Sequence, residues 1–430
     1  MSQILDYKCP NCSSPLLFQP GTQSLKCSSC GTEMDAAAFT ALDEALKTGD
    51  AAADYGTYRG AALDEVNQQH CNSCGGELIT DGTAIVTECP YCGNTAIITQ
   101  RVKGALKPDY VIPFKIEGDA AKSTLRDFYK KKPLLPKHFK TDSQIDKLTG
   151  VYVPFWLYDC DTDSQGVYDA TRTRSWTSGN TRYTETSHYL ATRRGELSFD
   201  KLPVDASEKM DDAAMEAIEP YNYQDMAPFS TAYLTGHLAD RQDVDFAKCK
   251  PRIDERVNKS VDDSLRGTVR GYNSVRRRSL NVRVTKHNIS YAMLPVWLLN
   301  TKWKNKNYPF TMNGQTGKMT GRLPVDKKKA FFIFLPIFAL LAALSIALTL
   351  VFDDGSFSLP LVLGICIAVS AAIPAIVIAV MAAKMKTKPS RRLSKVYERN
   401  FRLTRQSDVF LYKTVSRQQI QSSSSPTRRR

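Results

Sequence analysis

The sequence predicts a multidomain protein with two cysteine-rich β modules, a mixed α/β (α+β) middle domain and a C-terminal two-helix transmembrane hairpin. Three observations predict this order. Eight of the 11 cysteines fall into four Cys-x-x-Cys pairs near the N-terminus, and two long uncharged segments lie near the C-terminus. The residues between them mix strand and helix patterns. A chain of 430 residues has room for two or three domains.

The four cysteine pairs form an internal repeat. In each set two pairs are separated by 14 residues, and the second set follows the first at a displacement of 62 positions. The sets are Cys9, Cys12, Cys27 and Cys30, and Cys71, Cys74, Cys89 and Cys92. Two residues between cysteines allow a turn that points both sulfurs at one ion, and the longer gap fits a β-hairpin. We therefore expect two β zinc ribbons at 1–34 and 67–100, joined by a helical linker at 35–66.

The predicted metal sites are structural. Four thiolates complete the coordination of a zinc ion and leave no open position for a substrate. A ribbon of about 30 residues cannot stabilise itself by burial alone, whereas zinc binding supplies roughly 10–16 kcal/mol. The sequence thus predicts two Zn²⁺ ions. Iron in a rubredoxin-like site is the alternative metal.

The middle domain is expected over 101–326, and its elements follow from caps, breakers and alternation. Helices are expected at 119–132, capped by Asp119, at 211–219 and from Ser260 to about 271. Strands are expected at 151–158, 182–191, 280–285 and 291–303. The strings VPFWL and LPVWL resemble one another and predict two buried strands, each with its proline at the start.

Several motifs in this domain are incomplete, and we predict no catalytic or cofactor-binding residues. Asp159, Asp161 and Asp163 alternate like the start of a calcium loop, but the glycine that such a loop needs is missing. Residues 314–318 resemble a phosphate-binding loop, but the gap is too short and Met319 replaces the required Ser or Thr. The five histidines have no metal-ligand spacing. We therefore expect a protein that is not an enzyme.

Two uncharged segments predict the membrane hairpin. Residues 330–352 would span about 35 Å as a helix, enough for a hydrocarbon core of roughly 30 Å. After a short loop, residues 357–383 provide a second span. The hairpin is therefore expected over 330–383.

Charges on the flanks predict how the hairpin is oriented. Basic residues precede the first span and follow the second, namely Lys327, Lys328, Lys329, Lys384, Lys386, Lys388, Arg391 and Arg392. The loop between the spans has Asp353, Asp354 and no basic residue. Since positive charge stays inside, we expect a multi-pass protein of the cell (inner) membrane with both termini cytoplasmic. Thiolate ligands also require a reducing compartment, and the start MSQILDYKCP does not resemble a signal peptide.

Positive charge is concentrated in residues 384–430, which we expect to form a basic cytoplasmic tail. These residues include 14 Lys and Arg but only Glu398 and Asp408 as acids, giving +12 of the total +14. Lys and Arg near an anionic leaflet each contribute about 1 kcal/mol of attraction. Anionic lipids are therefore the expected partner of this tail, with residues 395–413 lying in part on the bilayer.

The chain resembles a bacterial family of membrane proteins described as carrying a transcription-factor-IIB-type zinc ribbon. The likeness runs from the first ribbon to about residue 325 and rests on long strings: CPYCG, PDYVIPF, LLPKHF, GVYVPFWLYD, ETSHY, IEPYNYQDMAPFSTAYLTGHLAD, YAMLPVWLL and MNGQTGKMTGRLPVD. The resemblance implies association with phage-shock-protein-A-like, flotillin-like and other membrane proteins in envelope-stress systems.

These observations favour a membrane scaffold that recruits cytoplasmic or membrane proteins to the inner leaflet. The alternative is a membrane-tethered regulator that binds nucleic acid. The ribbons carry few Lys or Arg and no basic–aromatic stripe, so protein partners are favoured over nucleic acid.

Overall fold

The computed structural model places the chain in two units, each built from several stretches of sequence. It describes residues 9, 12, 14–35, 66–80, 89–94, 97–102, 106–352, 359–385 and 395–419. Unit 1 consists of Met1–Phe155, Asp205–Asp245 and Tyr291–Ser390. Unit 2 consists of Trp156–Val204, Phe246–Ser290 and Arg391–Arg430. The expected helical linker falls almost wholly outside the described residues.

The first cysteine set belongs to a small antiparallel sheet in unit 1. Its strands are β1 (Leu16–Gln19), β2 (Ser24–Cys27) and β3 (Glu33–Asp35), in the order β1-β2-β3. The pairs from Leu16↔Cys27 to Gln19↔Ser24 form a β1–β2 hairpin whose turn includes Gly21. Leu16 and Leu25 are fully buried between the strands, so the module has a minimal apolar core.

The second cysteine set lies on strands that join the large sheet. Its strands are β4 (Val66–Cys71), β5 (Glu77–Thr80) and β6 (Ile97–Val102), with β4 pairing to both others. β5 also pairs antiparallel with β11 (Leu238–Asp240), and β11 runs parallel to the start of β8 (Thr149–Ser178). Residues 81–88, expected to complete a hairpin after β5, lie outside the described residues.

The core of unit 1 is formed by the ends of two long strands. Val151–Phe155 of β8 and residues 291–299 of β12 (Ser274–Trp303) are buried without a break. Around them lie β7 (Tyr110–Val111), β10 (Ala227–Pro228), β13 (Lys306–Asn313) and β14 (Met319–Gly321). Pro154 and Pro295 sit inside these strands, not at their starts as expected. Their carbonyls instead accept hydrogen bonds from Ala206 and Gly314, which tie neighbouring loops to the sheet.

Short helices complete unit 1. They are α2 (Gly118–Lys130), η1 (Lys137–Lys140), α3 (Asp142–Ile145), α4 (Asp212–Ile218), η2 (Tyr223–Asp225) and η3 (Thr231–Leu234). α2 begins one residue before the expected Asp119, with Glu117 at the N-cap position. The expected helix over 211–219 is found as α4, which Asp211 caps by accepting a hydrogen bond from the N–H of Ala213.

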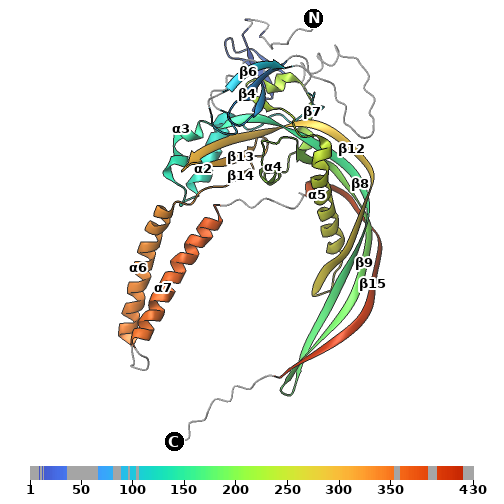
Figure 1. Ribbon diagram of the computed structural model, residues 1–430, viewed down its shortest axis with the longest axis vertical. Helices are drawn as coiled ribbons and strands as arrows, with labels where there is room; N and C mark the ends of the chain where they lie inside the picture. The colour runs from blue at the N-terminus through green and yellow to red at the C-terminus, as the bar shows by residue number, and fades with distance from the viewer. Residues whose placement is uncertain are drawn as a thin grey trace. The chain divides into compact units, whose positions relative to one another are not determined.

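Unit 2 is a long sheet with one helix against it (Figure 1). The distal part of β8 forms a hairpin with β9 (Thr181–Asp205), and the first half of β12 continues the sheet. α5 (Phe246–Gly267) packs on one face, where the Tyr168 hydroxyl lies 3.1 Å from a carboxylate oxygen of Asp262. The expected start of this helix at Ser260 is wrong, because the helix continues through Pro251 and buries Ser260 in its interior.

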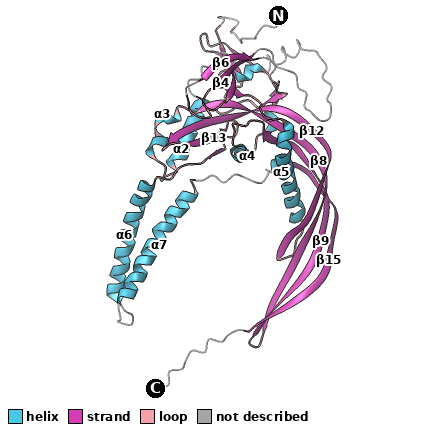
Figure 2. Cartoon of the chain, viewed as in Figure 1, coloured by secondary structure: helices cyan, strands magenta, loops and turns pink. Residues whose placement is uncertain are grey.

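The segment expected to be a basic tail contributes an edge strand to unit 2. After η4 (Lys395–Tyr397), β15 (Glu398–Gln419) pairs antiparallel with β9 from Glu398↔Phe199 to Gln419↔Thr181 (Figure 2). Side-chain ion pairs join the two strands, including Arg402–Glu196 at 2.8 Å and Lys413–Glu185 at 3.2 Å. Residues 398–419 are therefore a strand of the folded sheet, whereas the sequence predicted a basic tail.

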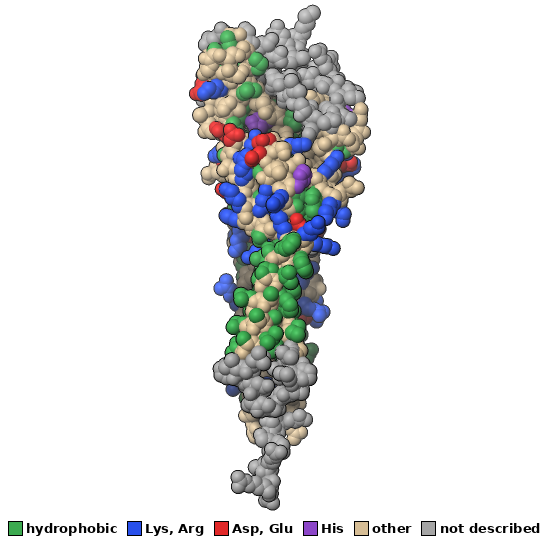
Figure 3. Space-filling view, turned by 90° about the vertical axis from the view of Figure 1, so that its left-hand side faces the viewer, with side chains coloured by type: hydrophobic (Ala, Val, Ile, Leu, Met, Phe, Trp, Pro, Cys, Tyr) green, Lys and Arg blue, Asp and Glu red, His purple; other side chains and the backbone are tan. Residues whose placement is uncertain are grey.

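Two apolar helices, α6 (Lys327–Phe352) and α7 (Leu359–Ala383), form the hairpin of unit 1. Lys327–Leu348 and Gly364–Ala383 are long and apolar enough to cross a membrane, each with a mean hydropathy of 2.7. Hydrophobic side chains cover the hairpin, and Lys and Arg side chains gather above it (Figure 3). This finding confirms the two apolar helices that the sequence predicts.

The base of the hairpin is tied to the soluble part of unit 1. The N–H of Asp326 donates to the carbonyl of Leu134 at 2.9 Å, and the N–H of Leu323 donates to Met385 at 3.2 Å. Lys329 and Lys132 donate to the carbonyls of Leu135 and Lys384. These bonds hold both ends of the hairpin against the loop that follows α2.

Candidate metal centres

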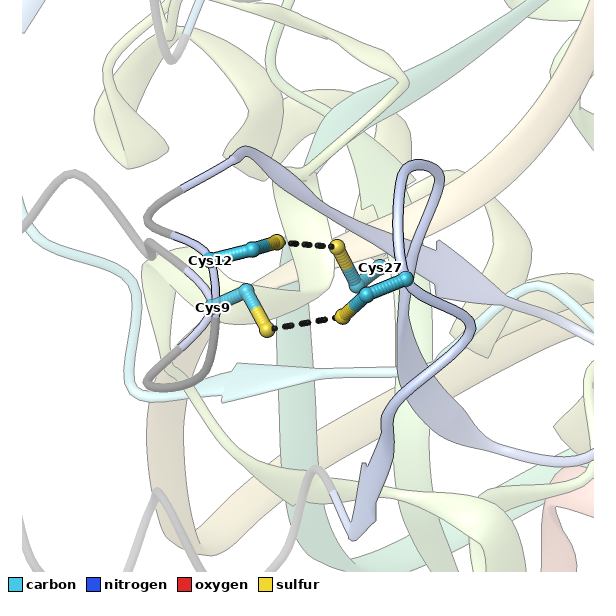
Figure 4. A group of neighbouring side chains, drawn as sticks. Cys9, Cys12 and Cys27 are labelled. Carbon is cyan, nitrogen blue, oxygen red and sulfur yellow. Dashed lines mark hydrogen bonds between the residues drawn. The ribbon is translucent and has the colours of Figure 1, made fainter.

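Each cysteine set brings four sulfurs together in a metal-binding arrangement. Within each set the four Sγ atoms all lie within 4.8 Å of one another. Cys9–Cys30 and Cys12–Cys27 are each 3.4 Å apart (Figure 4), and Cys71–Cys92 and Cys74–Cys89 are each 3.7 Å apart. A tetrahedron with metal–sulfur bonds of about 2.3 Å has sulfurs roughly 3.8 Å apart. Both groups can therefore hold one metal ion each.

The knuckle turns repeat the same backbone bonds. In three knuckles the N–H of a glycine bonds to the carbonyl of the first cysteine, as in Gly31→Cys27, Gly75→Cys71 and Gly93→Cys89. These glycines have φ of +76°, +69° and +67°, a conformation that costs other residues energy. This geometry explains why a glycine directly follows each of these three Cys-x-x-Cys pairs.

Hydrogen bonds favour the thiolate form of Cys12, Cys30 and Cys71, whereas burial raises the pKa of Cys74 and Cys89. The hydroxyl of Thr32, 3.1 Å from Cys30 Sγ, and its backbone N–H lower the pKa of Cys30. Backbone and hydroxyl contacts from Ser14 lower the pKa of Cys12. Burial acts to raise the pKa of Cys71, but backbone N–H groups of Cys74 and Ser73 outweigh it and lower that pKa to about 7.

The two centres differ in their surroundings. In the first set Cys12 and Cys30 are exposed, whereas in the second set Cys74 and Cys92 are partly covered. The cover over the second set comes from distant parts of unit 1. The Lys209 ammonium donates to the carbonyl of Cys74 at 2.7 Å, and the Asn300 amide of β12 donates to the carbonyl of Tyr91.

Tyr91 lies between the second cysteine set and the body of unit 1. Its ring packs on Gly76, where an added Cβ would come within 2.7 Å of it. Its hydroxyl is buried next to Asp240 of β11, and burial together with this carboxyl raises the pKa of Tyr91 well above its usual value. Burial also raises the pKa of Asp240 to about 7, although the side chains of Ser207 and Tyr91 act to lower this pKa.

The segment 230–240 connects both centres to the core. On one side the ring of Phe18 in β1 packs edge-on against the ring of Tyr233, with centroids 5.3 Å apart. The backbone N–H of Phe18 donates a hydrogen bond to the carbonyl of Thr235. On the other side β11 pairs with β5 of the second centre. The Gln23 amide also reaches the carbonyl of Phe114 at 2.7 Å. The two ribbons are thus docked on the body of unit 1 and not suspended on linkers.

The other motifs of the sequence have structural roles. Asp159, Asp161 and Asp163 lie along β8, where Asp163 accepts hydrogen bonds from Arg194 and Arg283 at 2.6 and 3.0 Å. In the loop at 313–318, the Asn313 amide donates to the carbonyl of Ile218 and Gln315 donates to Asp225. This loop therefore clamps residues 218–225 and does not form a phosphate cradle.

Sequence reasoning identified the eight sulfurs but missed the residues that surround the second set. Lys209, Asp240 and Asn300 come from three separated segments, and no local spacing links them to a cysteine. The one available signal was the string CPYCG, in which Tyr91 is an aromatic residue inside a metal knuckle.

The fold and the sites define a class of protein: two four-cysteine centres near the N-terminus, a large mixed sheet, and two apolar helices near the C-terminus. A comparison with known proteins gives the family. The chain is 36% identical over 326 residues to the uncharacterized protein YdjG of Bacillus subtilis (strain 168), covering 76% of this chain and 92% of the relative. The chain belongs to the YdjG family. No family model and no solved structure matches it.

Proposed function

We propose that this protein is a membrane-anchored scaffold whose metal-bound body recruits cytoplasmic or membrane proteins to the inner leaflet. The observation that carries the proposal is the continuity of unit 1, in which the second metal centre, the large sheet and the base of the hairpin form one hydrogen-bonded structure. Such a body holds its surfaces at a fixed position relative to the helices. Partners related to phage-shock protein A or flotillins fit the resemblance described above.

The proposed metal is zinc, with one ion in each four-cysteine set. Complete thiolate coordination suits a structural Zn²⁺ ion, and iron shares the same geometry. Metal analysis of the purified protein distinguishes the two. Two zinc ions per chain support the proposal, and bound iron with visible absorption contradicts it.

The proposed topology places both ends of the chain in the cytoplasm. β9 precedes the hairpin and β15 follows it, yet the two strands pair along their length. If α6 and α7 each cross the bilayer, this pairing requires that the chain returns to the side from which it left. The lysines at 327–329 and the basic residues after α7 favour the cytoplasmic side.

Co-purification from native membranes tests the scaffold. The tagged full chain is extracted in detergent, and the proteins that accompany it are identified. The matched control carries Cys74→Ser and Cys89→Ser, which removes the second metal site. We expect specific protein partners with the wild type and their loss with the control variant, and the absence of specific partners from the wild type contradicts a scaffold.

A second candidate function is nucleic-acid binding from the membrane surface. It is favoured by unit 2, which contains 29 Lys and Arg against 13 Asp and Glu. Binding of this kind weakens steeply with salt because counterions are released. Titration of the detergent-solubilised protein with a labelled duplex at two salt concentrations tests it, and no binding at low salt excludes it.

A further inference from the structure

Positive charge is concentrated in unit 2, and part of it lies on the strands of the sheet. Within the bounds of unit 2 the sequence carries a net charge of +16, and within unit 1 it carries −2. The excess is shared between the segment 246–290 and the C-terminal segment that includes β15. Five of the basic residues expected in the tail therefore lie on a strand, where their positions and neighbours are defined: Arg399, Arg402, Arg405, Lys413 and Arg417.

One face of the distal sheet combines arginine with aromatic side chains. We call it the arginine–aromatic face, and it comprises Arg172, Trp176, Tyr183, Tyr189, Phe410 and Arg417. Trp176 stacks on Tyr183 with ring centroids 5.7 Å apart, and the Arg417 guanidinium lies 5.8 Å from the same Tyr183 ring. Arg172 lies 5.9 Å from the ring of Tyr189, which also meets Phe410 at 5.5 Å. The face thus consists of two clusters, each of which contains residues from three strands.

A β-bulge places the β15 residues on this face. The register pairs Phe410 with Tyr189 and Arg417 with Tyr183, and it shifts by one residue between Phe410 and Tyr412. Residues seven positions apart on a regular strand point to opposite faces. The extra residue, Leu411, restores Arg417 to the side of Phe410. The mixed face therefore depends on this irregularity.

The arginine–aromatic face is exposed, and its acidic neighbours are neutralised. Trp176 is 40% exposed and Phe410 is 52% exposed. Asp408 is held by a bidentate ion pair with Arg193, and Glu185 is paired with Lys413. The Arg193 guanidinium lowers the pKa of Asp408, so this pair persists at neutral pH. The face consequently presents net positive charge and apolar rings to solvent.

We propose that the arginine–aromatic face docks on the anionic phospholipid headgroups of the leaflet from which the hairpin enters the membrane. Arginine attracts the headgroup phosphates, while Trp and Tyr favour the interface between headgroups and acyl chains. This proposal rests on the hairpin crossing the bilayer, which is part of the proposed function.

Chain connectivity favours lipid over nucleic acid as the occupant. Only 14 residues lie between Ala383 of α7 and Glu398 of β15, and they can reach at most about 50 Å. The arginine–aromatic face lies further along the sheet, with Phe410 12 residues beyond Glu398. It stays covalently tied to the proposed membrane anchor, which raises the effective concentration of lipid at the face. Single-stranded nucleic acid offers similar chemistry but has no such tether.

Tryptophan quenching in nanodiscs tests the docking. The full chain is reconstituted into discs of phosphatidylcholine alone, or of phosphatidylcholine mixed with phosphatidylglycerol, with acyl chains brominated near the headgroup. The signal of Trp176 is obtained by subtracting the fluorescence of a Trp176→Phe version. We expect quenching of Trp176 in the phosphatidylglycerol discs, little in the others, and release from quenching as salt is raised.

Charge variants identify the surface responsible. Arg172→Gln with Arg417→Gln should lower the ratio of docked to undocked protein about 25-fold, or about fivefold for each arginine. The matched control, Lys302→Gln with Lys304→Gln, removes equal charge from unit 1 and should leave quenching unchanged. Because Arg172 also bonds to the carbonyl of Gly271, the exposed pair Arg174→Gln with Arg417→Gln repeats the test without that contact, since Arg174 lies on the same face of β8 as Trp176.

Three outcomes overturn the proposal. They are equal quenching in both lipids, full quenching in both arginine variants, and oligonucleotide binding lost in these variants without lipid-dependent quenching. Failure of the scaffold proposal is distinguished from failure of the docking proposal. In that case no specific partners co-purify with the protein, but Trp176 is still quenched in the phosphatidylglycerol discs.

Discussion

The two metal centres share one cysteine spacing but differ in how they are joined to the protein. The first belongs to a small sheet of its own, and it touches the body through Phe18 and Gln23. The second shares a sheet with the body, and its knuckle carbonyls accept bonds from Lys209 and Asn300. The Cys-x-x-Cys spacing thus determines how a metal ion can be bound. The strands next to each centre determine which part of the protein needs that ion to stay folded.

The largest expected effect is loss of the second metal. A structural zinc contributes roughly 10–16 kcal/mol to the state that binds it. Cys89→Ser should therefore abolish the cooperative unfolding transition of unit 1, because β5 would no longer be held beside β11. Cys30→Ser should remove one metal ion and leave that transition in place. Metal content and thermal unfolding in detergent measure both, and equal damage from the two variants would erase the distinction between the centres.

The docking of the first ribbon should depend mainly on Phe18. This side chain is 97% removed from solvent and packs on Tyr233, and replacing such a phenylalanine by alanine costs about 3–5 kcal/mol. Phe18→Ala should release the ribbon from the body while its metal stays bound. Hydrogen exchange at 14–35 and metal content report the two properties. The control is Thr22→Ala, at an exposed site of the same ribbon. In this variant hydrogen exchange at 14–35 should be as slow as in the wild type.

Asp240 should make the second centre sensitive to pH. Burial raises the pKa of Asp240 to about 7 from a usual value of 3.8, so the folded state keeps a proton that the unfolded state releases. Stability contributed by this group is fully present below about pH 4 and is lost as pH rises towards 7. Asp240→Asn should therefore add on the order of 4 kcal/mol to the free energy of unfolding at pH 7.5 and almost nothing at pH 4. Denaturant unfolding at the two pH values measures this, and an equal change at both would exclude titration of Asp240.

The smallest expected effect concerns the amide of Asn300. Its loss leaves the carbonyl of Tyr91 without this donor, which costs roughly 1–3 kcal/mol for a buried group. Asn300→Ala should lower the unfolding midpoint of unit 1 slightly and accelerate metal release from the second centre alone. Release to a chromogenic chelator measures the rate. Asn305→Ala in the nearby turn should release both metals at wild-type rates, and acceleration at the first centre would contradict the assignment.

Local patterns predicted the parts of this protein that are built locally. The eight sulfurs follow from Cys-x-x-Cys spacing, and α6 and α7 follow from uninterrupted apolar runs. The hairpin turn at Asn313 and Gly314, between β13 and β14, also agrees with its sequence. In each case residues close in the chain determine the structure, so one sequence window contains the necessary information.

Structure that depends on distant segments was missed. β15 is largely exposed on both faces, so it lacks the alternation of apolar and polar residues by which a strand is recognised. Its partner β9 lies before both apolar helices. The start of α5 was missed because Pro251 lies inside the helix, and proline usually breaks a helix. The residues around Tyr91 come together only when β11 enters the sheet.

The pairing of β9 with β15 has a consequence for the order of synthesis. β9 is complete when the ribosome reaches Asp205, but its partner does not exist until Glu398 has been made. At 5–20 residues per second this interval is roughly 10–40 s. Throughout it one edge of the sheet has no neighbouring strand. If both apolar helices cross the bilayer, as we propose, unit 2 can be completed only in chains whose hairpin has returned to the starting compartment.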